Sequence, residues 1–163
     1  MGIGGGTRYW RKGVPLASFA DGDVRLMAIR AFEMSTQAAP LVCLVDPDPM
    51  VQRSVKKLLK ALGAVIEVFP SARDLLARLP DGIPACIITE ARLPDMTGLA
   101  LLQELRARGL NIPVILLSSD ADVSSAVTAM RAGALDFIEK PYIDRALVAQ
   151  MGPILELDAN RTH

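Results

Sequence analysis

Four side chains with acid, hydroxyl or ammonium groups each follow a short apolar run in this sequence. They are Asp46 after Leu41–Val45, Glu90 after 85–89, Ser118 after 113–117, and Lys140 shortly after 135–138. Carboxylates can hold a hard cation, whereas a hydroxyl and an ammonium can bind anionic oxygens. If the runs are neighbouring strands, the four side chains lie at one edge of a sheet.

Other kinds of chemistry have few candidate residues. The single histidine is the final residue, His163, which argues against Ser-His or Cys-His catalysis and against most zinc sites. Cys43 and Cys86 each lie inside an apolar run, so we interpret them as buried thiols rather than a disulfide. No glycine-rich phosphate loop follows residue 45, and we therefore predict that the chain is not an enzyme.

The rest of the pattern supplies the elements that position these side chains. Apolar runs at 41–45, 65–69, 85–89, 113–117 and 135–138 predict strands, and each is followed by residues with helical spacing. Asp48, Ser71 and Asp122 are predicted helix N-caps. Gly63, Gly109 and Gly133 are predicted to follow the ends of three helices. The last helix should kink or end at Gly152–Pro153.

Five strand–helix pairs predict an α/β fold with a doubly wound, five-stranded parallel sheet. Right-handed crossovers favour the flavodoxin-like strand order 2-1-3-4-5. Ligands of such sheets bind beyond the carboxyl ends of the strands, which is the edge that Asp46, Glu90, Ser118 and Lys140 share.

Three segments make the chain similar to a known family. They are Val45–Asp48, Glu90–Gly98 and Ala129–Pro141, the last reading AMRAGALDFIEKP. With them the chain resembles the CheY-like receiver domain of bacterial two-component response regulators, especially the FixJ-type transcription regulators. The resemblance extends from about Leu41 to Leu155.

The resemblance implies a phosphorelay site. In that family two acids after strand 1 and an aspartate on strand 3 hold magnesium, and that aspartate accepts a phosphoryl group. Asp46 matches the first acid, Ser118 the strand-4 hydroxyl, Lys140 the strand-5 lysine, and Phe137 the switch aromatic, without its hydroxyl. Lys140–Pro141 matches the family's cis peptide.

Two positions depart from the family pattern. Pro47 stands where the second acid would ligate the metal, and Glu90 replaces the acceptor aspartate. We therefore expect magnesium binding to be weak or absent, with Asp46 and Glu90 the residues concerned if any metal binds, and no other cofactor. We also expect a direct or water-bridged contact between Glu90 and Lys140 in a partly exposed pocket.

These observations predict a degenerate receiver that signals by protein contact without aspartyl phosphorylation. One alternative is a working phosphoacceptor that uses another carboxylate, such as Asp95 or Asp48. Another is the receiver fragment of a longer transcription regulator. The partner, the pathway and the effect of Glu90 on the active state cannot be read from the sequence.

Composition limits the possible partners. The formal net charge is zero and no basic field predicts direct nucleic-acid binding; no apolar run is long enough to span a membrane. We expect a cytoplasmic protein that contacts a protein partner or a second copy through the fourth helix, fifth strand and fifth helix of the predicted fold. The candidate interface charges are Arg131, Asp136, Glu139, Asp144 and Arg145.

The predicted domain organisation has three parts. Residues 1–40 form an amino-terminal extension, residues 41–155 the receiver domain, and residues 156–163 a tail. The extension is either a docking arm or the product of a mis-assigned start codon, with Met34 as the natural start.

Overall fold

The computed structural model describes residues 25–26, 39–120, 122–141 and 143–161. The chain divides into two units, Met1–Ala38 and Ala39–His163, and the second contains the sheet. Most of the predicted extension lies outside the described residues, so both alternatives for it stay open.

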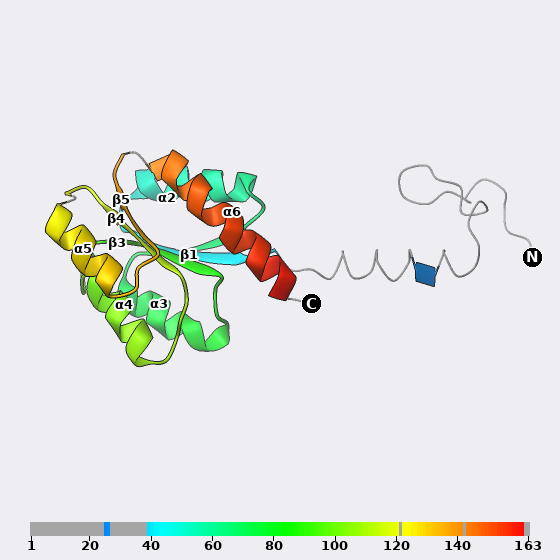
Figure 1. Cartoon of the computed structure of the whole chain (residues 1–163), viewed down its shortest axis with the longest axis horizontal. Helices are drawn as coiled ribbons and strands as arrows, with labels where there is room; N and C mark the ends of the chain where they lie inside the picture. The colour runs from blue at the N-terminus through cyan, green and yellow to red at the C-terminus, as the bar shows by residue number, and fades with distance from the viewer. Residues whose placement is uncertain (1–24, 27–38, 121, 142, 162–163) are drawn as a thin grey trace, which may run out of the picture. The chain divides into compact units, whose positions relative to one another are not determined.

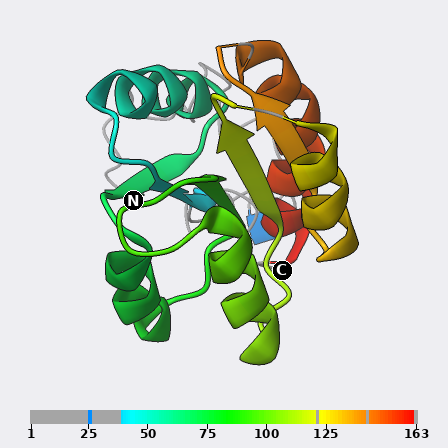
Figure 2. The same ribbon diagram turned by 90° about the vertical axis from the view of Figure 1, so that its left-hand side faces the viewer.

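Five short parallel strands form one sheet in the order β2-β1-β3-β4-β5, which confirms the predicted topology (Figure 1). The strands are β1 Leu41–Val45, β2 Val65–Phe69, β3 Cys86–Glu90, β4 Val114–Ser118 and β5 Asp136–Glu139. In β3 and β4 every residue is buried, because helices cover both faces of the sheet. The arrowheads of β4 and β5 point to the same edge, drawn in yellow-green and orange in Figure 2.

The helices form two layers around the sheet. α2 and α6 cover one face, and α3, α4 and α5 cover the other (Figure 1). The helices are α2 Pro49–Ala61, α3 Ala72–Arg78, the 3-10 turn η3 Leu79–Asp81, α4 Gly98–Ala107, α5 Val123–Arg131 and α6 Ile143–Arg161. Successive strand residues point to opposite faces, so Leu44 packs in the first layer and Val45 in the second. No helix in the described ranges is long and apolar enough to cross a membrane.

The predicted helix boundaries are largely confirmed. Asp48, Ser71 and Asp122 each accept a hydrogen bond from a backbone N–H of the first turn of their helix. The glycines that follow α2, α4 and α5 adopt the positive φ that favours glycine: 88° at Gly63, 76° at Gly109 and 98° at Gly133.

Of the kink or end predicted at Gly152–Pro153, the end is wrong. α6 continues through Gly152 and Pro153 to Arg161, so most of the predicted tail at 156–163 is helical. Pro153 itself is exposed, whereas Ile154 and Leu155 behind it are buried in the core layer with α2. Burial of these two side chains favours continuation of the helix over the hydrogen bond that proline removes.

The two cysteines are buried free thiols, as predicted. Cys43 and Cys86 lie on the paired strands β1 and β3 but pack into opposite layers, so their side chains point away from each other. Burial raises the pKa of Cys43 to about 11 and that of Cys86 to about 12, which keeps both thiols protonated and unreactive.

Candidate functional site

The carboxyl edge of the sheet gathers the side chains that the sequence singles out. Glu90 and Ser118 are the last residues of β3 and β4, Asp46 follows β1 directly, and Lys140 follows β5. Asp46, Glu90 and Ser118 are buried polar residues, and parallel pairing from β1 to β5 places their strand ends at this one edge.

An ammonium shared by two carboxylates forms the centre of the site. Lys140 Nζ donates to Asp46 Oδ2 at 2.9 Å and also contacts Glu90 Oε2 directly. The predicted contact between Glu90 and Lys140 is therefore confirmed in its direct form. We call these three residues the Asp46–Glu90–Lys140 cluster.

The remaining oxygen of each carboxylate also has a backbone donor. Asp46 Oδ1 accepts from the N–H of Asp48 at 2.8 Å, and Glu90 Oε1 accepts from the N–H of Arg92 at 3.3 Å. Gln52 Nε2 of α2 donates to the carbonyl of Asp46 at 2.6 Å. Both carboxylates are thus fixed in place by their own loops as well as by the lysine.

Gly98 lets the loop after β3 fold closely over the site. A Cβ at this position would lie 2.6 Å from the carbonyl oxygen of Glu90 and 3.3 Å from Cα of Ala91. A larger residue would therefore push the first turn of α4 away from the end of β3, where Glu90 is held.

The three side chains of the cluster differ in burial. The side chains are 1% exposed at Asp46, 11% at Glu90 and 14% at Lys140. The prediction of a partly exposed pocket is confirmed at Lys140, which is half-buried, whereas Asp46 and Glu90 are buried. Burial alone lowers the pKa of Lys140, but its hydrogen bonds to Glu90 and Asp46 and their charges outweigh burial and raise it.

Ser118 and Phe137 line a neighbouring hollow of about 260 Å³ between the loop after β3 and the first turns of α5. Ser118 Oγ accepts from the N–H of Asp120 at 3.1 Å, and the backbone N–H of Lys140 donates to the carbonyl of Ser118 at 2.8 Å. Phe137 is half-buried against the second layer. Ser118 thus lies one strand away from Glu90 and Phe137 two strands away, and both line the same hollow.

The residues at this edge do not fit a magnesium ion. Pro47 has no side-chain oxygen, and each oxygen of Asp46 and Glu90 already accepts a hydrogen bond from Lys140 or a backbone N–H. Asp48 Oδ1 accepts from Met50 as the cap of α2. In the described part of the chain, no three acidic, cysteine or histidine side chains group as metal ligands. The Lys140 ammonium is the cation that contacts both carboxylates in this structure.

Asp95 has a role that the sequence analysis did not predict. Its carboxylate, on the loop before α4, accepts from the backbone N–H groups of Ala72 at 3.2 Å and Arg73 at 2.9 Å. It therefore caps α3 together with Ser71, and these hydrogen bonds lower its pKa despite the opposing desolvation. Because the partners lie more than 20 positions away in the chain, no local pattern marks this role.

The candidate interface charges have different surroundings. Arg131, Glu139, Asp144 and Arg145 are exposed on α5, β5 and α6. Asp136 is half-buried, and its carboxylate accepts from the N–H of Phe137 and from Gln150 of α6. Four of the five predicted interface charges are therefore accessible, and the fifth, Asp136, forms hydrogen bonds within the domain.

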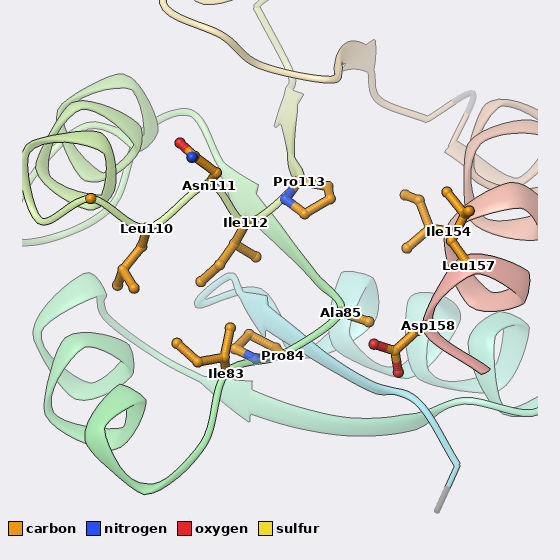
Figure 3. A pocket seen from close by; sticks show the side chains of 11 residues that line it. Ile83, Pro84, Ala85, Leu110, Asn111, Ile112, Pro113, Ile154, Leu157 and Asp158 are labelled. Carbon is orange, nitrogen blue, oxygen red and sulfur yellow. The ribbon is translucent and has the colours of Figure 1, made fainter. Parts of the chain in front are cut away.

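A larger hollow of about 570 Å³ lies at the opposite, amino edge of the sheet (Figure 3). The segments 83–85 and 109–113 line it together with Ile154, Leu157 and Asp158 of α6. Its walls are mainly apolar, and Ile83 and Leu157 are well exposed at 60% and 65%. None of the predicted site residues lines this hollow, so it is separate from the Asp46–Glu90–Lys140 cluster.

Comparison with known proteins gives one consistent family. Residues 42–151 match the response regulator receiver domain. The chain is 41% identical over 111 residues to the transcriptional regulatory protein FixJ of Azorhizobium caulinodans, covering 66% of this chain and 51% of that protein.

Solved structures agree with this match. The crystal structure of FixJ-N is 36% identical, with a TM-score of 0.65 over 73% of this chain and 95% of that chain. A response regulator receiver protein from Pseudoalteromonas atlantica is 37% identical, with a TM-score of 0.67 over 72% and 98% of the two chains. The chain spans about half the length of the curated relatives it matches.

Proposed function

The chain belongs to the response regulator receiver domain family of two-component signalling, and we propose that this member signals by protein contact without aspartyl phosphorylation. One observation supports the proposal: the Lys140 ammonium contacts the carboxylates of both Asp46 and Glu90. In this view the chain is an atypical pseudo-receiver that works in the cytoplasm and is not an enzyme.

The chemistry of the two substituted positions supports the proposal. Pro47 removes an oxygen ligand, so the charge of an incoming phosphoryl group has no second acid to hold a neutralising metal. Glu90 carries one methylene more than aspartate, which places its carboxylate against the ammonium of Lys140. A carboxylate in that position is engaged in an ion pair, which lowers its reactivity as a nucleophile.

Two alternatives draw on other observations. A substitute acceptor would have to be Asp95 or Asp48, and both carboxylates cap helix N-termini. The receiver could instead belong to a longer transcription regulator, because curated relatives are about twice as long as the matched region. An immunoblot of the source cells, which gives the size of the natural protein, separates that alternative from a stand-alone module.

Incubation with acetyl phosphate and magnesium, followed by intact-mass measurement, tests the proposal. The native chain is expected to gain no phosphoryl group. The variant with both Pro47→Asp and Glu90→Asp should regain some labelling, whereas Glu90→Asp alone should gain little because one metal ligand is still missing. An acid-labile mass increment on the native chain would contradict the proposal.

We further propose that the α5–β5–α6 face binds a protein partner or a second copy of the chain. Several apolar side chains on these elements or next to them are exposed: Val123, Val127, Met130, Leu135 and Val148. Arg131, Asp144 and Arg145 are exposed on the same elements, and arginines that face Asp144 across a two-fold axis would form an isologous contact. An apolar patch with a charged rim is the common form of a protein interface.

A further inference from the structure

The outward face of α2 carries an unusual set of charges. Arg53, Lys56, Lys57 and Lys60 are all exposed, and we call them the basic stripe. At 100° per residue the four positions fall within an arc of about 100°, opposite the buried side chains Val55 and Leu59 of the same helix. The stripe runs about 10 Å along the helix axis.

Nothing in the described part of the chain neutralises this stripe. α2, which reads PMVQRSVKKLLKA, contains no acidic residue. No ion pair among the described residues includes any of the four cations. Elsewhere on the surface, Arg108 at the end of α4 pairs with Glu104 at 2.9 Å, so the domain can pair surface charges where acids are present.

The spacing makes the four cations repel one another. Arg53 with Lys57, and Lys56 with Lys60, stand four positions apart, and Lys57 with Lys60 stands three apart. Like charges at these spacings are neighbours on a helix and destabilise it. An acidic partner would remove this repulsion and gain attraction at the same time.

We propose that the basic stripe of α2 binds an acidic helical segment of a partner protein, with carboxylates spaced three and four residues apart. Such a segment repeats the spacing of the stripe, so its carboxylates can meet several cations at once. This inference rests on the proposed function only in that a module without phosphoryl chemistry acts by contact. It concerns a face separate from α5–β5–α6.

Two other classes of polyanion match the stripe less well. Single-stranded nucleic acid is bound by cations interleaved with aromatic side chains, and α2 has no aromatic residue. A membrane-binding helix carries several large apolar residues beside its cations. Gln52, Ser54 and Ala61 flank this stripe, and Met50 is the one large apolar side chain of α2 that is exposed near it. Charge and surroundings together favour an acidic protein surface.

The test measures binding of the full chain to a fluorescent helical peptide of about 15 residues, with glutamates spaced to match the stripe. A second peptide has the same composition, with its glutamates spread around the helix. The matched peptide is expected to bind roughly tenfold more tightly, and added salt should weaken its binding.

Two variants with the same loss of charge locate the contact. Lys56→Gln with Lys60→Gln removes two cations of the stripe. Arg73→Gln with Arg108→Gln removes two exposed cations, one on α3 and one directly after α4. The first pair should weaken binding by roughly tenfold, and the second by less than about twofold. Circular dichroism checks that both variants keep the native helix content.

Three outcomes would overturn the inference. They are equal loss of affinity in the two double variants, equal binding of the two peptides, and tighter binding of a single-stranded oligonucleotide or of phosphatidylserine vesicles through the same lysines. Acetyl phosphate labelling of the same samples is read separately by mass. Labelling would overturn the proposed function and leave the peptide comparison fully interpretable, so the two failures are distinguishable.

Discussion

At the level of single side chains, the site depends on one ammonium that serves two buried carboxylates. Lys140 neutralises one negative charge, and the N–H groups of Asp48 and Arg92 stabilise the remaining one through hydrogen bonds. Such an arrangement is stable only while the lysine is present, because a buried carboxylate pair without a cation is costly.

Lys140→Met is therefore expected to lower the free energy of unfolding by about 3 kcal/mol, since it leaves Asp46 and Glu90 facing each other without a cation. Urea unfolding near pH 7 measures this loss. Lys57→Met, which removes an exposed lysine of α2, is the control and should change stability little. Equal effects of the two changes would show that the cluster contributes no special stability.

The pH dependence of this loss follows from the raised pKa of Lys140. A raised value means that the stabilisation is fully present below the ordinary lysine value of 10.5 and is lost as pH rises through the folded value. The difference between native and Lys140→Met proteins should thus be constant from about pH 6 to about pH 9 and shrink above about pH 10.5.

The sequence predicts the members of the site better than their surroundings. Asp46, Glu90, Ser118 and Lys140 are identifiable because each follows an apolar run, and a parallel sheet brings the ends of such runs together. The degree of burial and the role of Asp95 depend on loops that fold back from distant positions. Local patterns carry no information about these approaches.

At the level of elements, α6 continues past a proline because the residues beyond it pack into the core. Proline inside a helix usually ends it, yet Ile154 and Leu155 bury their side chains beyond Pro153 and keep the helix intact. The helix therefore retains an unfavourable residue on its exposed side.

Pro153→Ala is expected to stabilise the protein by about 1–3 kcal/mol, because alanine restores a helical N–H and has a higher helix propensity. Thermal and urea unfolding both report this change. The matched control is Pro49→Ala, at the first position of α2, where a proline suits the helix and replacement should bring no gain. A loss of stability in Pro153→Ala would mean that the proline itself contributes to packing.

At the scale of the whole molecule, the strand order and the two helix layers can be predicted from the sequence. The individual hydrogen bonds that link one element to another cannot. The continuous apolar runs of the strands and the five strand–helix pairs are enough to predict the order 2-1-3-4-5. Arg106 illustrates what is missed: its guanidinium donates to the carbonyls of Leu110, Ile112 and Gly133, and so ties the end of α4 to the turn after α5. The hydrogen bond to Gly133 joins segments that come together only in the folded protein, so no spacing in the sequence predicts it.

The proposed α5–β5–α6 interface makes a prediction at the same scale. Met130→Lys should abolish self-association or partner binding through that face, because a buried charge would oppose the contact. Sedimentation equilibrium at high protein concentration measures the association. Met50→Lys alters a methionine on α2 that is more exposed, 70% against 48%, and should leave it unchanged. A native chain that stays monomeric and binds no partner through this face would rule out the interface.

The Asp46–Glu90–Lys140 cluster also has a consequence for how a signal from this protein is timed. Its cation is a side chain, so its stoichiometry is fixed at synthesis and a chelator cannot remove it. Under the proposed function there is no acyl phosphate to hydrolyse, and hence no decay that resets the molecule. The strength of the output is then set by how many copies the cell makes and how fast it degrades them, and its duration is that of the polypeptide itself.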